Sequence, residues 1–241
     1  MGANGKVGAY MVQIDCSNKS ITQINQGIKA GLTNDGEVVV VNPASRHNLG
    51  VGIHQPGKVV FEGNVGYYCA GMLMQADVEI RGNCGWSVGS DMMSGSIVVH
   101  GNASAAAGAA IRGGLLVVHG NAGPRTGISM KGGTVVIGGN VDYMSAFIMQ
   151  KGVLVVCGDT GEALGDSMYE GRIFVRGTVA EHGNDAIDEK LTAEDETLLE
   201  KLLSKHNVAG VPKPDEFTKI VSGKQLYNFN IKDFELWRVA L

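Results

Sequence analysis

The sequence predicts an all-β protein: a right-handed parallel β-helix of about seven coils, with helical segments at both ends. Two observations lead to this prediction. Glycine is abundant at 36 of 241 residues, yet proline stands at only 5, which does not fit collagen or a disordered linker. The glycines recur every 19 residues between short Val/Ile-rich runs, in units that begin at Gly57 and continue to the unit beginning at Gly171.

Several columns of this repeat stay in step from coil to coil. The seventh position is glycine in every unit: Gly63, Gly82, Gly101, Gly120, Gly139, Gly158 and Gly177. Asparagine follows in the first five units, and the Gly-Asn pair predicts a bend with positive φ. A second short strand is expected to end at the seventeenth position, where Leu, Met or Ile fills the core. One unit cannot bury its own apolar face, so the coils must stack.

The repeat divides the chain into three parts. Residues 1–35 form an N-terminal capping segment with one helix, and residues 36–178 form the β-helix, whose first coil is a longer unit that begins at Gly36. Residues 179–241 form a C-terminal helical and aromatic tail. Solenoid ends need caps, and the two flanks are the candidates for this role.

Each flank contains a predicted helix. Ser20 and Gln23 form a capping-box signature before a helix with three isoleucines on one face. The second helix begins after Thr192 with an acidic first turn and ends near Asn207. Its expected buried residues are Leu198, Leu199, Leu202 and Leu203. Beyond it, an aromatic-rich stretch is expected to dock on another surface; its aromatic residues are Phe217, Tyr227, Phe229, Phe234 and Trp237.

Charge and cysteine usage restrict the class of protein. A net charge of −4 argues against a nucleic-acid or anionic-membrane surface. The four cysteines show no C-x-x-C spacing and match neither a zinc nor an iron–sulfur pattern. We find no leader-like start and no apolar run of the roughly 18 residues needed to span a membrane. We therefore expect a cytoplasmic protein with free thiols.

His100 and His119 are the first candidates for a chemical site. Both occupy the sixth position of adjacent coils, so they are predicted to lie one above the other. Zinc needs three or four convergent ligands, but the next coil offers Gly138, and Cys157 lies one coil further on. The pair is therefore predicted to be part of an outward polar ladder, with no metal bound.

The sequence offers no catalytic constellation. Its glycine motifs follow strands but open no helix, so they match neither a dinucleotide fold nor a P-loop. No serine, cysteine or histidine stands in a recognisable nucleophile context. Asp91, Asp142 and Asp166 vary too much in position for a paired acid and base. We expect no catalytic, cofactor-binding or metal-binding residue in this chain.

The fourth position of each unit does not fit a purely structural repeat. If the third and fifth positions of the strand face inward, the fourth faces outward, yet it is almost always apolar. The candidate interface residues are Val98, Val117, Val136, Val155 and Phe174. Such an apolar row needs a cover, which is either the chain's own terminal helices or another subunit. The sequence leaves these two possibilities open.

The repeat resembles the GXGXG domain, which is the C-terminal β-helix of the glutamate synthase large chain and also occurs in one subunit of formylmethanofuran dehydrogenase. The resemblance by repeat covers residues 36–178. The flanks sharpen it, because SITQINQGIKAGL before the N-P-x-x-x-H loop at Asn42 to His47, and the tail KPDEFTKIVSGKQLYNFNI, look like the stand-alone subunit of N-methylglutamate synthase or of split glutamate synthases.

This resemblance implies a non-catalytic scaffold in a glutamine-dependent complex of oxidoreductase and amidotransferase type. A glutaminase subunit and a synthase subunit with FMN and an iron–sulfur cluster are the implied partners, and the cofactors belong to those partners. The alternative is the β-helix subunit of a formylmethanofuran dehydrogenase or formyltransferase/hydrolase complex. An acyltransferase-like β-helix ranks below both, because hexapeptide repeats do not fit a period of 19.

Overall fold

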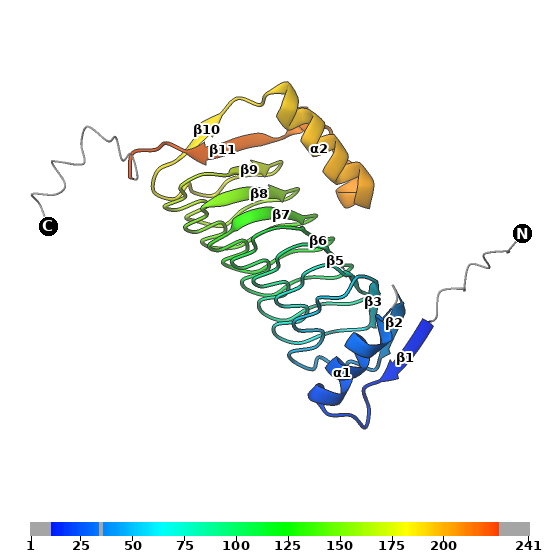
Figure 1. Cartoon of the computed structure of the whole chain (residues 1–241). Helices are drawn as coiled ribbons and strands as arrows, with labels where there is room; N and C mark the ends of the chain where they lie inside the picture. The colour runs from blue at the N-terminus through cyan, green and yellow to red at the C-terminus, as the bar shows by residue number, and fades with distance from the viewer. Residues whose placement is uncertain (1–10, 34–35, 227–241) are drawn as a thin grey trace, which may run out of the picture.

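The computed structural model describes residues 11–33 and 36–226, and these form one elongated stack of coils with a single long sheet (Figure 1). The elements in chain order are β1 (Met11–Asp15), α1 (Ile21–Gly31), β2 (Glu37–Val41), β3 (Lys58–Glu62), β4 (Asp77–Ile80), β5 (Ser96–Val99), β6 (Leu115–Val118), β7 (Lys131–Ile137), β8 (Lys151–Val156), β9 (Arg172–Val175), β10 (Ala186–Glu189), α2 (Ala193–His206), the 3-10 turns η1 (Val208–Gly210) and η2 (Pro214–Glu216), and β11 (Thr218–Ser222). The predicted parallel β-helix is confirmed.

The strand register repeats every 19 residues. Val59 pairs with Val78, which pairs with Ile97, and the same step continues to Ile173 in β9, always between parallel strands. Side chains at the third and fifth positions of each unit point inward and belong to the main core cluster, as predicted. The seventeenth-position residues are all fully buried in that core: Leu73, Met92, Ile111, Met130, Met149 and Met168.

An asparagine ladder holds one corner of the stack. The side-chain oxygen of Asn83 accepts a hydrogen bond from the backbone N–H of Asn102 at 2.8 Å, and the same contact repeats along the column. The ladder runs through Asn64, Asn83, Asn102, Asn121, Asn140, Asp159 and Thr178. Each coil is therefore tied to the next by a side chain as well as by the backbone.

The predicted positive φ at the Gly-Asn pair is wrong for most coils. Of the seventh-position glycines only Gly63 has a positive φ, and none of the ladder asparagines has one. Glycine is required there for a different reason: a Cβ at Gly101 would collide with the Asn83 side chain and with the carbonyl of Gly82 in the preceding coil. Close approach of successive coils, rather than turn conformation, selects this glycine.

The predicted second strand is also wrong among the described residues. Beyond the ladder the coils are joined by isolated bridges such as Val65 to Cys84 and Cys84 to Ala103, followed by a turn-rich segment. Left-handed conformations are frequent in that segment, including the fourteenth position, where Gly89 and Gly108 both have φ of 66°. Alternating backbone conformations therefore replace a strand on this side of the coil.

Two different caps close the stack. At the N-terminal end, α1 begins with the predicted capping box of Ser20 and Gln23 and buries Ile24 and Ile28. Strand β1, which the repeat did not predict, adds one parallel rung beside β2. At the C-terminal end, β11 pairs antiparallel with both β9 and β10.

The sheet extends beyond the expected β-helix segment at both ends. Its two edge strands are β1, from the expected N-terminal segment, and β10, from the expected C-terminal tail. Of the aromatic residues expected to dock, Phe217 is buried. Tyr227, Phe229, Phe234 and Trp237 lie outside the described residues.

Candidate functional site

The outward apolar column lies under the chain's own helix over much of its length. Val117, Val136, Val155 and Phe174 are fully buried in a second hydrophobic cluster, separate from the main core, together with Leu199 and Leu203 of α2. Figure 1 shows α2 running beside β9, β8 and β7 at the C-terminal end of the stack. Val98 packs against the edge of this cluster but stays half-buried. Within this chain, therefore, α2 is the cover, and the docking of another subunit on this column stays a prediction.

Local sequence explains why α2 forms and where it ends. Thr192 and Asp195 make a reciprocal capping box, and three acidic residues occupy the first turn, where they complement the helix dipole. Asn207 ends the helix in the left-handed conformation. The two predicted leucines Leu199 and Leu203 are buried, and Leu198 and Leu202 pack against the same cluster.

Asp195 anchors the first turn of α2 to the sheet. Its carboxylate is 1% exposed and accepts hydrogen bonds from Arg172 Nη1 at 2.7 Å and from Lys219 Nζ at 2.9 Å. Burial alone would raise the pKa of Asp195, but the hydrogen bonds from Lys219, Thr192 and Arg172 hold that pKa at about 2. The anchor joins α2, β9 and β11 at one point.

At the opposite end of α2 the histidines form a small cluster. The rings of His100 and His119 stack with centroids 5.4 Å apart, as the repeat predicts, and His100 Nε2 lies 3.2 Å from Glu79 Oε1. His206, the last residue of α2, lines the same cavity of about 290 Å³. Burial lowers the pKa of both His119 and His206. The described residues contain no group of three or more His, Cys, Asp or Glu arranged to hold a metal ion.

On the coils that precede this histidine cluster in the sequence, the outer face of the sheet is charged. Glu79 occupies the fourth position of its coil and contacts Lys58 Nζ at 3.1 Å and Arg81 Nε at 2.9 Å. Arg81 also contacts Glu62 at 2.6 Å. Burial would raise the pKa of Glu79, but the hydrogen bonds from Arg81 and Lys58 lower it to about 2. One charged residue in the apolar column thus organises an ion-pair network over β3 and β4.

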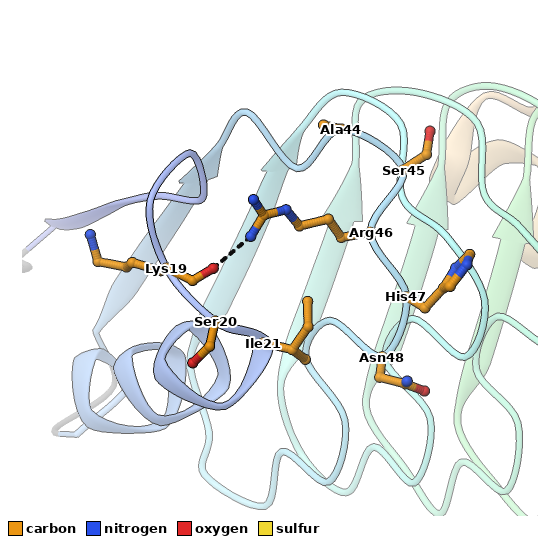
Figure 2. A pocket seen from close by; sticks show the side chains of 8 residues that line it. All are labelled: Lys19, Ser20, Ile21, Ala44, Ser45, Arg46, His47 and Asn48. Atoms are coloured by element: carbon orange, nitrogen blue, oxygen red, sulfur yellow. Dashed lines mark hydrogen bonds between the residues drawn. The ribbon is translucent and has the colours of Figure 1, made fainter.

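A second depression, of about 590 Å³, lies at the N-terminal end of the stack between the start of α1 and the first coil. Figure 2 shows Arg46 reaching toward the carbonyl of Lys19, to which its Nη1 donates a hydrogen bond at 2.6 Å, while His47 points the other way. With Lys19 and Arg46 on its wall, this depression is basic and suits a polar or anionic group.

His47 starts an aromatic ladder on the next coils. Its ring stacks on Tyr67 with centroids 4.2 Å apart, and Tyr67 stacks on Trp86 at 5.2 Å. A Cβ at Gly66 would collide with the His47 ring, and one at Gly85 would lie 2.6 Å from Tyr67 Cδ1. The sequence signal for this ladder was the 19-residue spacing of Tyr67 and Trp86, each preceded by a glycine.

The four cysteines are buried and free. Burial raises the pKa of every one of them, to about 12 for Cys84 and about 11 for Cys157. A thiol that stays protonated is a poor nucleophile and a poor metal ligand, so these side chains serve packing. In the part of the chain that the structure describes, no helix is both long and apolar enough to cross a membrane.

Comparison with known proteins assigns the repeat to a family. Residues 44–213 match the family described as GXGXG motif, a stretch that includes all the 19-residue coils and α2. Protein GlxC of Rhizobium meliloti (strain 1021) is 47% identical over 55 residues. That alignment covers 23% of this chain and 22% of the relative, so most of both proteins lies outside it.

Proposed function

Because this chain belongs to the GXGXG-motif family, we propose that it is a non-catalytic structural subunit of a glutamine-dependent glutamate-synthase-type complex. In this proposal the chain positions a glutaminase subunit and an FMN-containing synthase subunit, so that ammonia or an amine passes between their active sites. The product is glutamate or N-methylglutamate, and FMN and an iron–sulfur cluster belong to the synthase subunit.

The asparagine ladder is the observation that carries the proposal. Six hydrogen bonds of 2.7–2.8 Å from side chain to backbone link seven successive coils, from Asn64 to Thr178. At about 4.8 Å per coil, the ladder fixes a length of about 29 Å. A stack held in this way cannot stretch or slip, which suits a spacer between two active sites. Transfer between sites depends on such fixed positions more than on any group that this chain supplies.

Purification of the complex through a tag on this chain tests the proposal. We expect two co-purifying chains, one with glutaminase activity and one with bound flavin detected by its absorbance. The isolated chain is expected to show no glutaminase or reductase turnover. A partner that contains molybdopterin or tungsten would contradict the proposal in favour of the formylmethanofuran dehydrogenase alternative, and robust turnover by the pure chain would contradict the scaffold role.

A further inference from the structure

One corner of the coil carries a ridge of exposed side chains, just before the strand in four coils and at the first residue of the strand in β7 and β8. We use the name corner ridge for six residues: Met74, Met93, Arg112, Lys131, Lys151 and Tyr169. All are exposed; Met74, Met93 and Tyr169 are exposed by 43%, 46% and 41%. They lie on six successive coils, so at about 4.8 Å per coil the corner ridge is about 24 Å long.

Backbone hydrogen bonds tie the coils of the corner ridge together. The N–H of Arg112 donates to the carbonyl of Met92 at 2.8 Å, and the N–H of Lys131 donates to Ile111 at 2.8 Å. Lys131 also pairs with Lys151 of the neighbouring strand, 20 residues further on, and the register shifts between Lys131 and Thr134. A Cβ at Gly132, directly after Lys131, would collide with the carbonyl of Arg112. The three cations are therefore stacked on adjacent coils by a backbone that has little room to shift.

These three cations differ from those on the outer sheet face. Lys58, Arg81, Arg172 and Arg176 each make an ion pair there. In contrast, Arg112, Lys131 and Lys151 make no side-chain hydrogen bond or ion pair with any described residue. Like charges on neighbouring rungs of a sheet repel each other. The chain compensates its charges on one face and leaves them uncompensated at this corner.

We propose that the corner ridge binds an acidic surface of a partner subunit. This inference rests on the proposed function, because it names the face through which the scaffold holds a partner. The charge of the three cations requires carboxylates opposite them. Methionine, tyrosine and arginine are enriched at protein interfaces, and the corner ridge has exposed Met and Tyr at its two ends. Nucleic acid fits less well, because the whole chain carries a net charge of −4.

Zero-length cross-linking of the purified complex tests the contact directly. A carbodiimide joins a lysine amine to a carboxylate that touches it, and takes up the water released as the amide forms. We expect amides between Lys131 or Lys151 and an Asp or Glu of a co-purified chain, identified by mass spectrometry of the digested complex. Cross-links from these lysines to this chain alone, with the complex intact, would overturn the inference.

Charge reversal provides the matched comparison. Lys131→Glu with Lys151→Glu changes the net charge by the same amount as Lys201→Glu with Lys205→Glu, two exposed lysines of α2 that are not part of the corner ridge. We expect the first pair to weaken binding of the separated partner at least about tenfold, and the second pair to leave it nearly unchanged. Equal affinity of both variants would overturn the inference. Circular dichroism shows whether each variant is folded.

The two proposals fail in different ways. If the unaltered chain forms no complex with a glutaminase or flavin-containing chain, the proposed function is wrong. If that complex forms and the corner-ridge variant binds as tightly as the unaltered chain, the proposed function stands and the ridge inference is wrong. Binding of a single-stranded 30-mer oligonucleotide that is lost only in the corner-ridge variant would also overturn the inference, in favour of a nucleic-acid surface.

Discussion

Over strands β6–β9 the outer face of the sheet lies beneath helix α2, whereas over β3 and β4 the same face carries an ion-pair network. The two halves share one fold and one 19-residue register, and they differ at the fourth position of a single coil, because the fourth position on β3 is also apolar: it is Val60, which is 1% exposed. Val136 occupies that position in the covered half and is fully buried, while Glu79 occupies it in the charged half. One charged residue thus interrupts the apolar column and marks the part of the sheet face that carries ion pairs.

The ends of α2 show the same contrast. Its first turn is tied down by Asp195, which contacts Arg172 and Lys219. Its last residue, His206, has a buried Nε2 without a hydrogen-bond partner among the described residues. The helix is therefore anchored strongly over β9 and weakly where the apolar column gives way to charge.

Placing a charge within the covered half is expected to have the largest effect. Val136→Asp buries an unpaired carboxylate under α2 and is expected to destabilise the fold by more than about 4 kcal/mol, or to release the helix. Val98→Asp, at the half-buried edge of the same column, is the matched control and is expected to cost less than about 1 kcal/mol. Thermal unfolding and amide exchange of α2 measure the difference. Equal costs at the two positions would mean that α2 does not cover the column in solution.

The second-largest loss of stability is expected from removal of the Asp195 anchor. Asp195→Ala leaves the buried Lys219 with only Glu189 and deprives Arg172 of its partner, so we expect a loss of about 3 kcal/mol. Asp195→Asn keeps a side-chain oxygen for the N-cap contacts and is expected to lose less. Urea unfolding of both variants against the unaltered chain gives the comparison. An asparagine variant as stable as the unaltered chain would show that the ion pairs add nothing to the cap, and an alanine variant as stable as the asparagine variant would show that the cap contacts add nothing.

Because of the Asp195 carboxylate, we expect the free energy of unfolding to depend on pH. The pKa of Asp195 is about 2 in the folded chain, below its ordinary value of 3.8. The stabilisation is therefore fully present above about pH 4 and is lost as the pH falls from the ordinary value through the folded value. Unfolding free energies measured between pH 5 and 2 are expected to fall less steeply in Asp195→Ala than in the unaltered chain. Parallel curves for the two proteins would contradict this assignment.

The smallest effect is expected in the charged half. Glu79→Gln removes the carboxylate shared by Lys58, Arg81 and His100, but these pairs are partly exposed. We expect a loss of about 1 kcal/mol or less, and a still smaller loss at high salt because ions screen such pairs. Thermal unfolding at low and high salt checks both statements. A loss comparable to that of Val136→Asp would remove the contrast between the two halves.

The repeat made the coils, their register and the outward column predictable, because a 19-residue period assigns every position to a face. Capping signals at Ser20 and Thr192 likewise fixed the starts of both helices. Strands β1 and β11 were not predictable in this way, because they belong to no repeat. The partners of β11 lie 30 or more residues away in β10 and more than 40 residues away in β9.

The contacts of the candidate surfaces were harder to predict than the fold. The acidic first turn of α2 was visible in the sequence, but the ionic role of Asp195 depends on Arg172 and Lys219, which only the folded chain brings together. That Arg112 and Lys131 have no ionic partner among the described residues is equally invisible in sequence, because pairing depends on what lies opposite. Periodicity places a side chain on a face, and it does not name the side chain's neighbours.

The asparagine ladder has a consequence for how the length of this protein can change. Each ladder side chain must meet an N–H one coil further on, as Asn83 meets Asn102. A one-residue insertion between them would break that contact and also flip the following strand to the wrong face. Removal of a whole coil would instead restore every junction, since Asn83 would then meet Asn121. The molecule can therefore be lengthened or shortened only in steps of one coil, so the distance that it spans is quantised in units of about 4.8 Å.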